Sequence, residues 1–195
     1  EMDRQSANLA SWLQAQGFTR AEDVYQLCQR TRQSQKIQQL PELSRRRFDQ
    51  LMPLLIREAT QQQSTSPDTA LIRTLDLLES ICRRASYLAL LTEFPDALAL
   101  IVKLCAASPW IAQYVTAHPI LLDELLNEQT LFKRLDAALC QTELSRQMQA
   151  LQGDIEAQMD AIRHFKHAHV LKIAAQDVMT ALSLEAISDD LSALA

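Results

Sequence analysis

Glycine and proline are scarce in this sequence, with two glycines and six prolines among 195 residues. Sheet proteins with many tight turns need both residue types, so this scarcity argues against a β-rich fold. Leucine and alanine, which favour helices, are frequent instead. A chain of this length buries roughly 70% of its unfolded surface, which is enough for a hydrophobic core without disulfides. We therefore predict an all-α protein.

Positive charge is not in excess, and long apolar runs are missing. The net charge is −5, so nothing in the overall charge favours nucleic acid or an anionic membrane as a partner. No apolar run approaches the roughly eighteen residues that span a bilayer, and the N-terminus lacks the pattern of a signal peptide. We expect a cytoplasmic protein that binds neither nucleic acid nor membrane.

The cysteines also form no motif. Cys28, Cys82, Cys105 and Cys140 are widely separated and never form a C-x-x-C pair. Cys82 and Cys105 lie on apolar stripes, where a free thiol behaves as a small hydrophobic side chain. We predict reduced cysteines rather than disulfides or a zinc site.

The most informative stretch runs from Phe94 to Leu126. Pro95, Pro109 and Pro119 each open a new apolar pattern at helical spacing. Proline is tolerated at the first helical position, where its missing N–H would have no partner. Short helices are marginal on their own, so we predict a bundle in which they pack on one another and on a long C-terminal helix.

Two helices are predicted at the start of the chain. Apolar residues between Asp3 and Gln16 indicate a first helix that Gly17 ends. The segment Thr19-Arg20-Ala21-Glu22 matches a capping box, with Thr at the cap and Glu three residues later. It predicts the start of a second helix.

Residues 61–66, read QQQSTS, are the best candidate for an internal boundary. They separate a helix predicted from Glu42 to Gln62 from another that starts at Ser66-Pro67. Pro53 lies inside the first of these helices and must kink or split it. Because a piece of about sixty residues would have a thin core, we interpret residues 61–66 as a loop within a single domain, residues 1–195.

The C-terminal part contains no proline after Pro119. Thr130 to Leu144 is predicted to be helical, and the apolar rhythm from Leu144 to Val178 predicts either one long helix or two that meet near Gly153. Ser188 with Asp189 and Asp190 predicts the start of a last helix. The residues expected to face inward in the helix from Thr130 are Leu131, Leu135 and Leu139.

Candidate chemical groups all have simple structural interpretations. His164, His167 and His169 cannot converge on one ion from a single helix, so we interpret them as histidines of a polar face. We interpret three acid pairs as solvated: Asp123-Glu124, Glu156/Asp160 and Asp189-Asp190. Trp110 and Tyr114 are interpreted as core aromatic residues. The run Arg45-Arg46-Arg47 is interpreted as a solvated helix face, with partner docking as the alternative.

Four strings carry a resemblance to a known family. SYLALLTEFPDAL, CAASPWIAQYVTAHPILLDELL, FKHAHVLKIAAQDV and, more weakly, RRRFDQLMPLL are similar to bacterial glutamine synthetase adenylyltransferase/adenylyl-removing enzymes. The resemblance covers nearly the whole chain and is strongest from Tyr87 to Asp177. In that family two nucleotidyltransferase domains flank a helical middle region, and this chain resembles that region.

The resemblance implies a place in nitrogen metabolism. The family transfers AMP from ATP to a tyrosine of glutamine synthetase and removes it phosphorolytically, using Mg²⁺, in response to glutamine and the signalling protein PII. Its nucleotidyltransferase domains use a Gly-Ser turn followed by an Asp-x-Asp pair that holds Mg²⁺ against the triphosphate. The only glycines here are Gly17 and Gly153, and neither precedes an Asp-x-Asp. We predict no catalytic, cofactor-binding or metal residue in this chain.

The main hypothesis is therefore a non-catalytic, regulatory linker between two catalytic domains. Glu1 in place of Met, and a last apolar stripe without a cap, indicate an excised segment. The alternative is a free-standing helical adaptor whose apolar stripes bind partner helices. A weaker third hypothesis is a helical metal hydrolase that uses the histidines.

Overall fold

The computed structural model describes residues 2–180 and 182–194, without the side chains of residues 2–8, 128 and 129. Within these residues every regular element is a helix, which confirms the predicted all-α class. The contacts divide the chain into two compact units, Glu1–Pro119 and Ile120–Ala195. The single domain expected over residues 1–195 stays a prediction.

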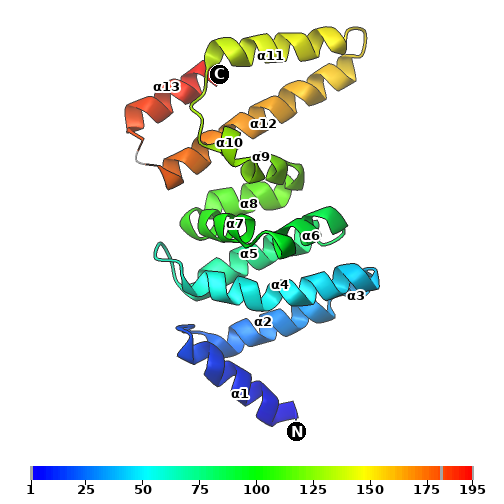
Figure 1. Ribbon diagram of the computed structural model, residues 1–195, viewed down its shortest axis with the longest axis vertical. Helices are drawn as coiled ribbons and strands as arrows, with labels where there is room; N and C mark the ends of the chain where they lie inside the picture. The colour runs from blue at the N-terminus through cyan, green and yellow to red at the C-terminus, as the bar shows by residue number, and fades with distance from the viewer. Residues whose placement is uncertain (1, 181, 195) are drawn as a thin grey trace. The chain divides into compact units, whose positions relative to one another are not determined.

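The first unit occupies the part of the ribbon from blue to green in Figure 1. Its core forms where α5 packs against α4, α7 and α8. Leu51 and Leu55 of α4 and Leu71, Leu75 and Leu78 of α5 are almost fully buried, at the three- and four-residue spacing that places them on one face. The helices are α1 (Met2–Ala15), α2 (Ala21–Gln33), α3 (Gln35–Gln38), α4 (Glu42–Thr60), α5 (Pro67–Ile81), α6 (Ala85–Glu93), α7 (Pro95–Ala107) and α8 (Pro109–Ala117).

Prolines start several of these helices, as predicted. Pro67, Pro95 and Pro109 all lie in the first turn of their helices. Ser66 and Ser108 supply the caps of α5 and α8, each accepting a backbone N–H with its hydroxyl oxygen, at 3.3 and 3.2 Å. In the described part of the chain no single helix is long and apolar enough to cross a membrane. The pair α7 and α8 reaches the necessary length and composition only when the two are taken together, and they meet at a bend of 120°.

Asp68 holds the start of α2, and the predicted capping box is wrong. Arg20 is the N-cap residue of α2, and no side chain of its own segment caps that end. The carboxylate of Asp68, which is fully buried, accepts the backbone N–H of Thr19 at 3.1 Å, its hydroxyl at 3.0 Å and the backbone N–H of Arg20 at 2.8 Å. A carboxylate from the start of α5 therefore accepts the backbone N–H of Thr19, which the predicted capping box assigned to Glu22.

Pro53 lies inside a continuous α4 and does not split it. Residues 61–66 have no regular structure and connect α4 to α5, which pack on each other. Residues 61–66 therefore form a loop between two packed helices, and their place within a single domain stays a prediction.

The second unit occupies the part of the ribbon from green to red. A short 3-10 turn, η1 (Pro119–Leu121), spans the division between the units, so Pro119 opens a turn of a different kind from the α-helices after Pro95 and Pro109. Within the unit, α12 packs against α9, α10, α11 and α13. The helices are α9 (Leu122–Leu126), α10 (Glu128–Leu131), α11 (Ala137–Ala150), α12 (Ile155–Met179) and α13 (Leu184–Leu194).

Three boundaries in this unit were open or wrongly predicted. The helix expected from Thr130 to Leu144 is interrupted, because α10 ends at Leu131 and α11 begins at Ala137. Asp136 caps α11 by accepting the N–H groups of Ala138 and Leu139. Gly153, with φ of +95°, lies in the turn between α11 and α12, so two helices meet there. The last helix begins at Leu184, ahead of the predicted start at Ser188.

The hairpin of α11 and α12 has an incomplete core. α11 contains no buried residue, and Leu139, expected to face inward, is 57% exposed. Leu135 lies outside any helix and is half-buried, whereas Leu131 is fully buried as expected. On α12 the buried residues are Ala168, Leu171, Ile173, Ala175 and Gln176, all in its C-terminal half.

Replacing Asp68 with Asn should lower the free energy of unfolding by about 1–3 kcal/mol at pH 7, because the amide nitrogen would face backbone donors with no acceptor. Desolvation raises the pKa of Asp68, but the hydrogen bonds from Arg20 and Thr19 outweigh it and leave the pKa below its ordinary value. The carboxylate therefore stabilises the fold above the ordinary aspartate pKa, and this contribution is lost as the pH falls through the lowered pKa.

The measurement is urea unfolding of wild type and Asp68→Asn from pH 7 to pH 3. The difference between them should shrink at the acid end. Asp96→Asn is the matched control, because Asp96 also follows a helix-opening proline but is exposed, and it should change stability by less than about 0.5 kcal/mol. An equal effect of the two variants would show that the buried hydrogen bonds of Asp68 contribute little.

Candidate functional site

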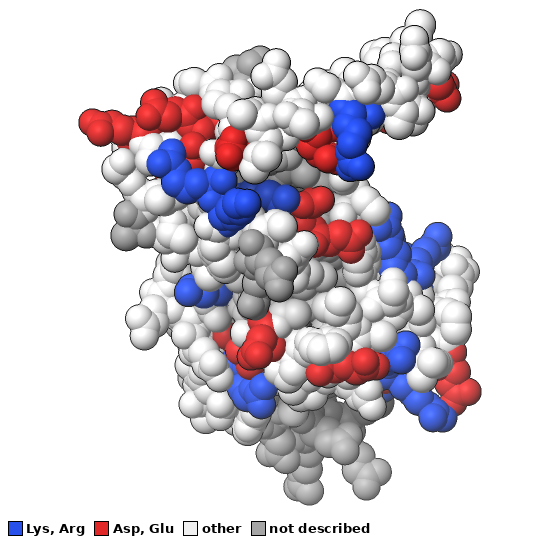
Figure 2. Space-filling model, turned by 45° about the horizontal axis from the view of Figure 1, so that its top comes forward, with Lys and Arg blue, Asp and Glu red and all other residues white. Residues whose placement is uncertain are grey.

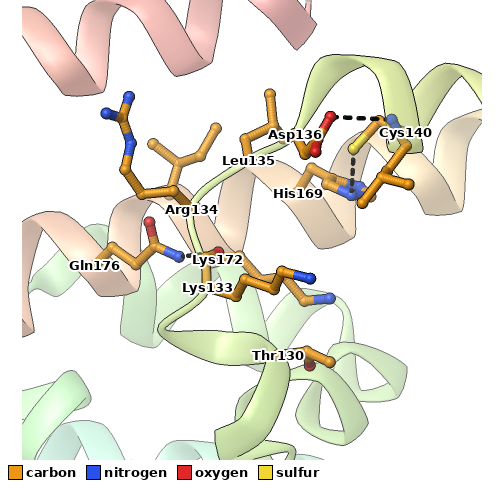
Figure 3. Close-up of a pocket in the computed structure, with 11 residues that line it drawn as sticks. Thr130, Lys133, Arg134, Leu135, Asp136, Cys140, His169, Lys172 and Gln176 are labelled. Carbon is orange, nitrogen blue, oxygen red and sulfur yellow. Dashed lines mark hydrogen bonds between the residues drawn. The ribbon is translucent and has the colours of Figure 1, made fainter.

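The candidate site is a pocket in the second unit, with a cavity volume of about 150 Å³. It lies where the connection between α10 and α11 crosses α12, as Figure 3 shows. It combines several charged and polar side chains with aliphatic ones, the mixture that small-molecule sites use. Its lining residues are Thr130, Lys133, Arg134, Leu135, Asp136, Leu139, Cys140, His169, Lys172, Ile173 and Gln176.

A second cavity, in the first unit, is larger and contains no charged residue. It measures about 400 Å³ and lies among α1, α2 and α4. Burial raises the pKa of the Cys28 thiol on its wall to about 11, so this thiol is protonated at neutral pH. Apolar walls without convergent polar groups give no reaction chemistry, so the smaller pocket is the stronger candidate. The walls of the larger cavity are Leu9, Trp12, Leu13, Tyr25, Cys28, Met52, Pro53 and Ile56.

Gln176 organises the connection beside the smaller pocket. Its side-chain N–H₂ group donates to the backbone carbonyls of Leu131 at 2.7 Å and Lys133 at 2.9 Å. These two acceptors fix the orientation of the amide. Gln176 is 2% exposed, and its Oε1 is a buried side-chain oxygen that has no hydrogen-bond partner among the described residues.

Cys140 and His169 face each other across the hairpin of α11 and α12. Cys140 Sγ lies 3.4 Å from His169 Nε2, while His169 Nδ1 lies 2.8 Å from the carbonyl oxygen of Phe165. A carbonyl oxygen only accepts hydrogen bonds, so Nδ1 carries the ring proton. Nε2 of the neutral ring then accepts a hydrogen bond from the Cys140 thiol. The ring of Phe165 also lies against the imidazole, with centroids 4.0 Å apart.

The electrostatics keep this pair uncharged. Burial, helped by the nearby carboxylate of Asp136, raises the pKa of the Cys140 thiol. Burial also lowers the pKa of His169, and the positive charge of Lys172 acts in the same direction. Nucleophilic cysteines need the opposite arrangement, a thiolate stabilised by an imidazolium. The pair therefore contributes packing and a hydrogen bond, with no activated nucleophile.

The cations around the pocket differ in their pairing. The Lys172 ammonium lies 2.6 Å from Glu124, and the Arg134 guanidinium lies 2.8 Å from the buried carboxylate of Asp190. Lys133 takes part in none of the ion pairs of the described residues. Figure 2 shows the basic side chains of one face in small groups beside acidic ones. That pattern matches the absence of a general basic field for nucleic acid.

His164 and His169, both predicted to lie on a polar face, differ in exposure. His164 is exposed, whereas His169 is half-buried in the pocket wall, so the polar-face interpretation is wrong for His169. Among the described residues no group of three or more His, Cys, Asp or Glu side chains could hold a metal ion.

None of the other sequence candidates lines the pocket. Arg46 is exposed and pairs with Glu42, as on a solvated helix face. Arg45 and Arg47 are half-buried, and Arg47 lies 3.8 Å from Glu93, so the solvated-face interpretation holds for Arg46 alone. Trp110 stacks on Tyr114 with centroids 4.4 Å apart, but it is 43% exposed. The prediction that Trp110 is a core residue is therefore wrong.

The two acids expected to be solvated at the last helix also differ. Asp189 is exposed, but Asp190 is 4% exposed and holds Arg134. The exposed pair Glu156 and Asp160 agrees with the prediction. Asp123 is exposed and Glu124 is half-buried against Lys172.

Comparison with known proteins identifies the family. The family model described as glutamate-ammonia ligase adenylyltransferase matches residues 98–195, half of the chain, including the whole pocket. The chain belongs to this family.

Three relatives in that family illustrate the similarity. All three are named bifunctional glutamine synthetase adenylyltransferase/adenylyl-removing enzyme. The chain is 45% identical to the protein of Chromobacterium violaceum over 163 residues, covering 84% of this chain and 18% of that one. For Thioalkalivibrio sulfidiphilus the identity is 41% over 194 residues, covering 99% and 20%, and for Neisseria meningitidis serogroup B it is 41% over 183 residues, covering 94% and 20%.

The chain thus spans about a fifth of the length of these adenylyltransferase relatives. Sequence reasoning missed two features of the site, the contact of Cys140 with His169 and the buried amide of Gln176. Gly153 was the available signal for the first, because a turn there folds α11 back on α12. Nothing in the sequence signalled the second, since Gln176 stands beside Asp177 in an ordinary helical segment.

Replacing Gln176 with Met, which keeps the length of the side chain, should lower the free energy of unfolding of the second unit by about 1–3 kcal/mol. The reason is that two backbone carbonyls lose their donor. Gln141→Met on the exposed face of α11 is the control and should be nearly neutral. Thermal or urea unfolding measures both, and equal stability of the two variants would contradict the proposed support.

All four thiols should react slowly with iodoacetamide at pH 7.5 in the folded chain, because burial raises the pKa of each. The measurement is the alkylation rate of each cysteine by mass spectrometry, in buffer and after unfolding in guanidinium. The rate at Cys140 should rise on unfolding. A faster rate in the folded chain would show that His169 activates the thiol.

Proposed function

We propose that this chain is the central, non-catalytic helical region of an enzyme that adenylylates and deadenylylates glutamine synthetase. The parent enzyme would transfer AMP from ATP to a tyrosine of glutamine synthetase and remove it phosphorolytically, with Mg²⁺ as the cation. The observation that carries the proposal is the combination of family membership with coverage of only about a fifth of each relative. The names of these relatives state the two opposed activities.

The local structure of the two glycines supports a catalytic centre elsewhere in the parent protein. Gly17 and Gly153 both have φ of +95° and lie in turns that follow helices α1 and α11. The family's phosphate-binding turn is a Gly-Ser pair whose backbone approaches the triphosphate closely. Gly17 is followed by Phe18 and Gly153 by Asp154, so neither glycine forms such a turn.

The role that follows for this region is coupling between the flanking catalytic domains. Packed helices transmit a choice between two reactions only if they have two arrangements with unequal affinities for an effector. Glutamine and PII are the effectors that we propose. A cytoplasmic location is part of the proposal, and four free cysteines support a reducing compartment.

The activity half of the proposal is tested by AMP transfer from labelled ATP to purified glutamine synthetase. The 195-residue chain alone should transfer no label, whereas the intact relative from Thioalkalivibrio sulfidiphilus should do so. Mg²⁺ is present in both assays and is omitted from a third, which should be inactive. Labelling of glutamine synthetase by the chain alone would overturn the non-catalytic assignment.

The regulatory half is tested separately by titrating glutamine and purified PII into the chain. Heat in calorimetry and altered amide exchange are the expected results. No heat and unchanged exchange protection would remove effector docking from this region, while the activity assay would still decide whether catalysis lies outside it.

A further inference from the structure

The N-terminal half of α12 carries an exposed apolar stripe. Its members Ile155, Met159 and Ile162 are 73%, 49% and 47% exposed. Their spacing of four and then three residues places them on one face of the helix. Every buried residue of α12 lies in its C-terminal half, where the helix packs against α9, α10 and α13. The stripe therefore lies outside the core of the second unit.

The stripe is also separate from the side of α12 that contacts α11. Gln158 Nε2 donates to the backbone carbonyl of Met148 at 3.1 Å, and His169 Nε2 lies 3.4 Å from Cys140 Sγ. These contacts lie on the adjoining side of α12, at about 100° per residue around the helix. In Figure 1 the two helices run away from α9 and α10 toward the turn that joins them. The hairpin thus leaves the stripe uncovered within its own unit.

The stripe has the pattern with which a helix enters an apolar groove. Such helices present anchors at positions i, i+4 and i+7, which is the spacing of Ile155, Met159 and Ile162. Lys166 continues the row four residues later. It is exposed and takes part in none of the ion pairs of the described residues. The complementary surface is therefore an apolar groove with an acidic side chain at one end.

The size of the stripe favours a groove in the same polypeptide over a separate protein or a second copy. Three apolar side chains expose far less than the roughly 800 Å² that each partner buries in a stable complex. A contact within one polypeptide needs less area, because linkage raises the effective concentration to the millimolar range. The chain covers about a fifth of each relative, and the family model matches residues 98–195, which include α12. A parent of that length supplies ample surface for the groove.

We propose that Ile155, Met159 and Ile162 insert into an apolar groove elsewhere in the parent enzyme, with an acidic side chain of the groove beside Lys166. The inference rests on the proposed function, because the groove must lie in the part of the parent outside this chain. α12 is one continuous helix from Ile155 to Met179. A displacement of the groove therefore reaches the core of the second unit through a single rigid element.

The experiment uses Met159 as a native probe. Dilute hydrogen peroxide is applied to the isolated chain and to the intact parent protein, and mass spectrometry follows the oxidation of each methionine. Met159 should oxidise about tenfold more slowly in the parent, because the groove covers its thioether. Met148, which is half-buried on α11, is the internal control and should oxidise at the same rate in both proteins.

Variants of the parent locate the contact. The double substitution Ile155→Ser with Ile162→Ser should return the oxidation of Met159 to about its rate in the isolated chain. Both side chains are exposed, so the circular dichroism spectrum of the chain should not change. Lys166→Glu should also speed the oxidation, because it places like charges together at one end of the groove. His164→Ser, at an exposed position on the opposite face of α12, is the matched control and should leave Met159 protected.

Three results would overturn the proposal. One is an equal rate at Met159 in the chain and in the parent. Another is protection in the isolated chain that grows with its concentration, which would identify a second copy as the occupant. The third is protection in the parent only after glutamine synthetase is added, which would identify a separate partner.

AMP transfer by the same preparation of the parent separates this inference from the proposed function. An active parent in which Met159 is unprotected contradicts the groove and leaves the proposed function standing. An inactive parent in which Met159 is protected contradicts the proposed function and leaves the covered stripe standing.

Discussion

Each end of a helix leaves backbone groups without partners, and two buried polar side chains of this chain, Asp68 and Gln176, satisfy such groups. Many short helices mean many such ends. In the first unit the fully buried Asp68 satisfies three donors at the start of α2. In the second unit the buried Gln176 donates to two carbonyls, that of Leu131 at the end of α10 and that of Lys133 just after it. The two side chains do opposite work, since one accepts and the other donates, and each joins elements that are far apart in the sequence.

The sequence predicted what depends on neighbouring residues and missed what depends on distant ones. Helix starts at Pro67, Pro95 and Pro109 were predictable because proline acts through its own backbone. The cap of α2 was not, because its acceptor Asp68 lies 48 residues from Arg20. The predicted local capping box does not form, because the buried carboxylate of Asp68 accepts hydrogen bonds from both Thr19 and Arg20.

The same reasoning explains the candidate site. The helical rhythm around Leu144 to Val178 predicted apolar stripes, but periodicity alone does not say whether a stripe is covered. Leu139 and Ile155 remain exposed. The helical spacing of these residues was therefore predicted correctly, but their burial was not. The interruption after Leu131 forms one wall of the pocket, and it was invisible because Phe132 to Leu135 contains no glycine or proline to mark a break. The histidines were interpreted as residues of a polar face, but the contact of His169 with Cys140 depends on how α11 folds back on α12, which the pattern of a single helix does not show.

The shallow packing of α11 has a consequence for local stability. None of its side chains is fully buried, and Leu144 and Met148 are only half-buried, so separating α11 from α12 would expose less apolar area than separating a core helix. Segments with few buried apolar contacts open locally at a fraction of the global unfolding free energy. Leu139 and Cys140 lie on α11, whereas His169 and Gln176 lie on α12, so local opening of α11 would widen the cavity that these residues line.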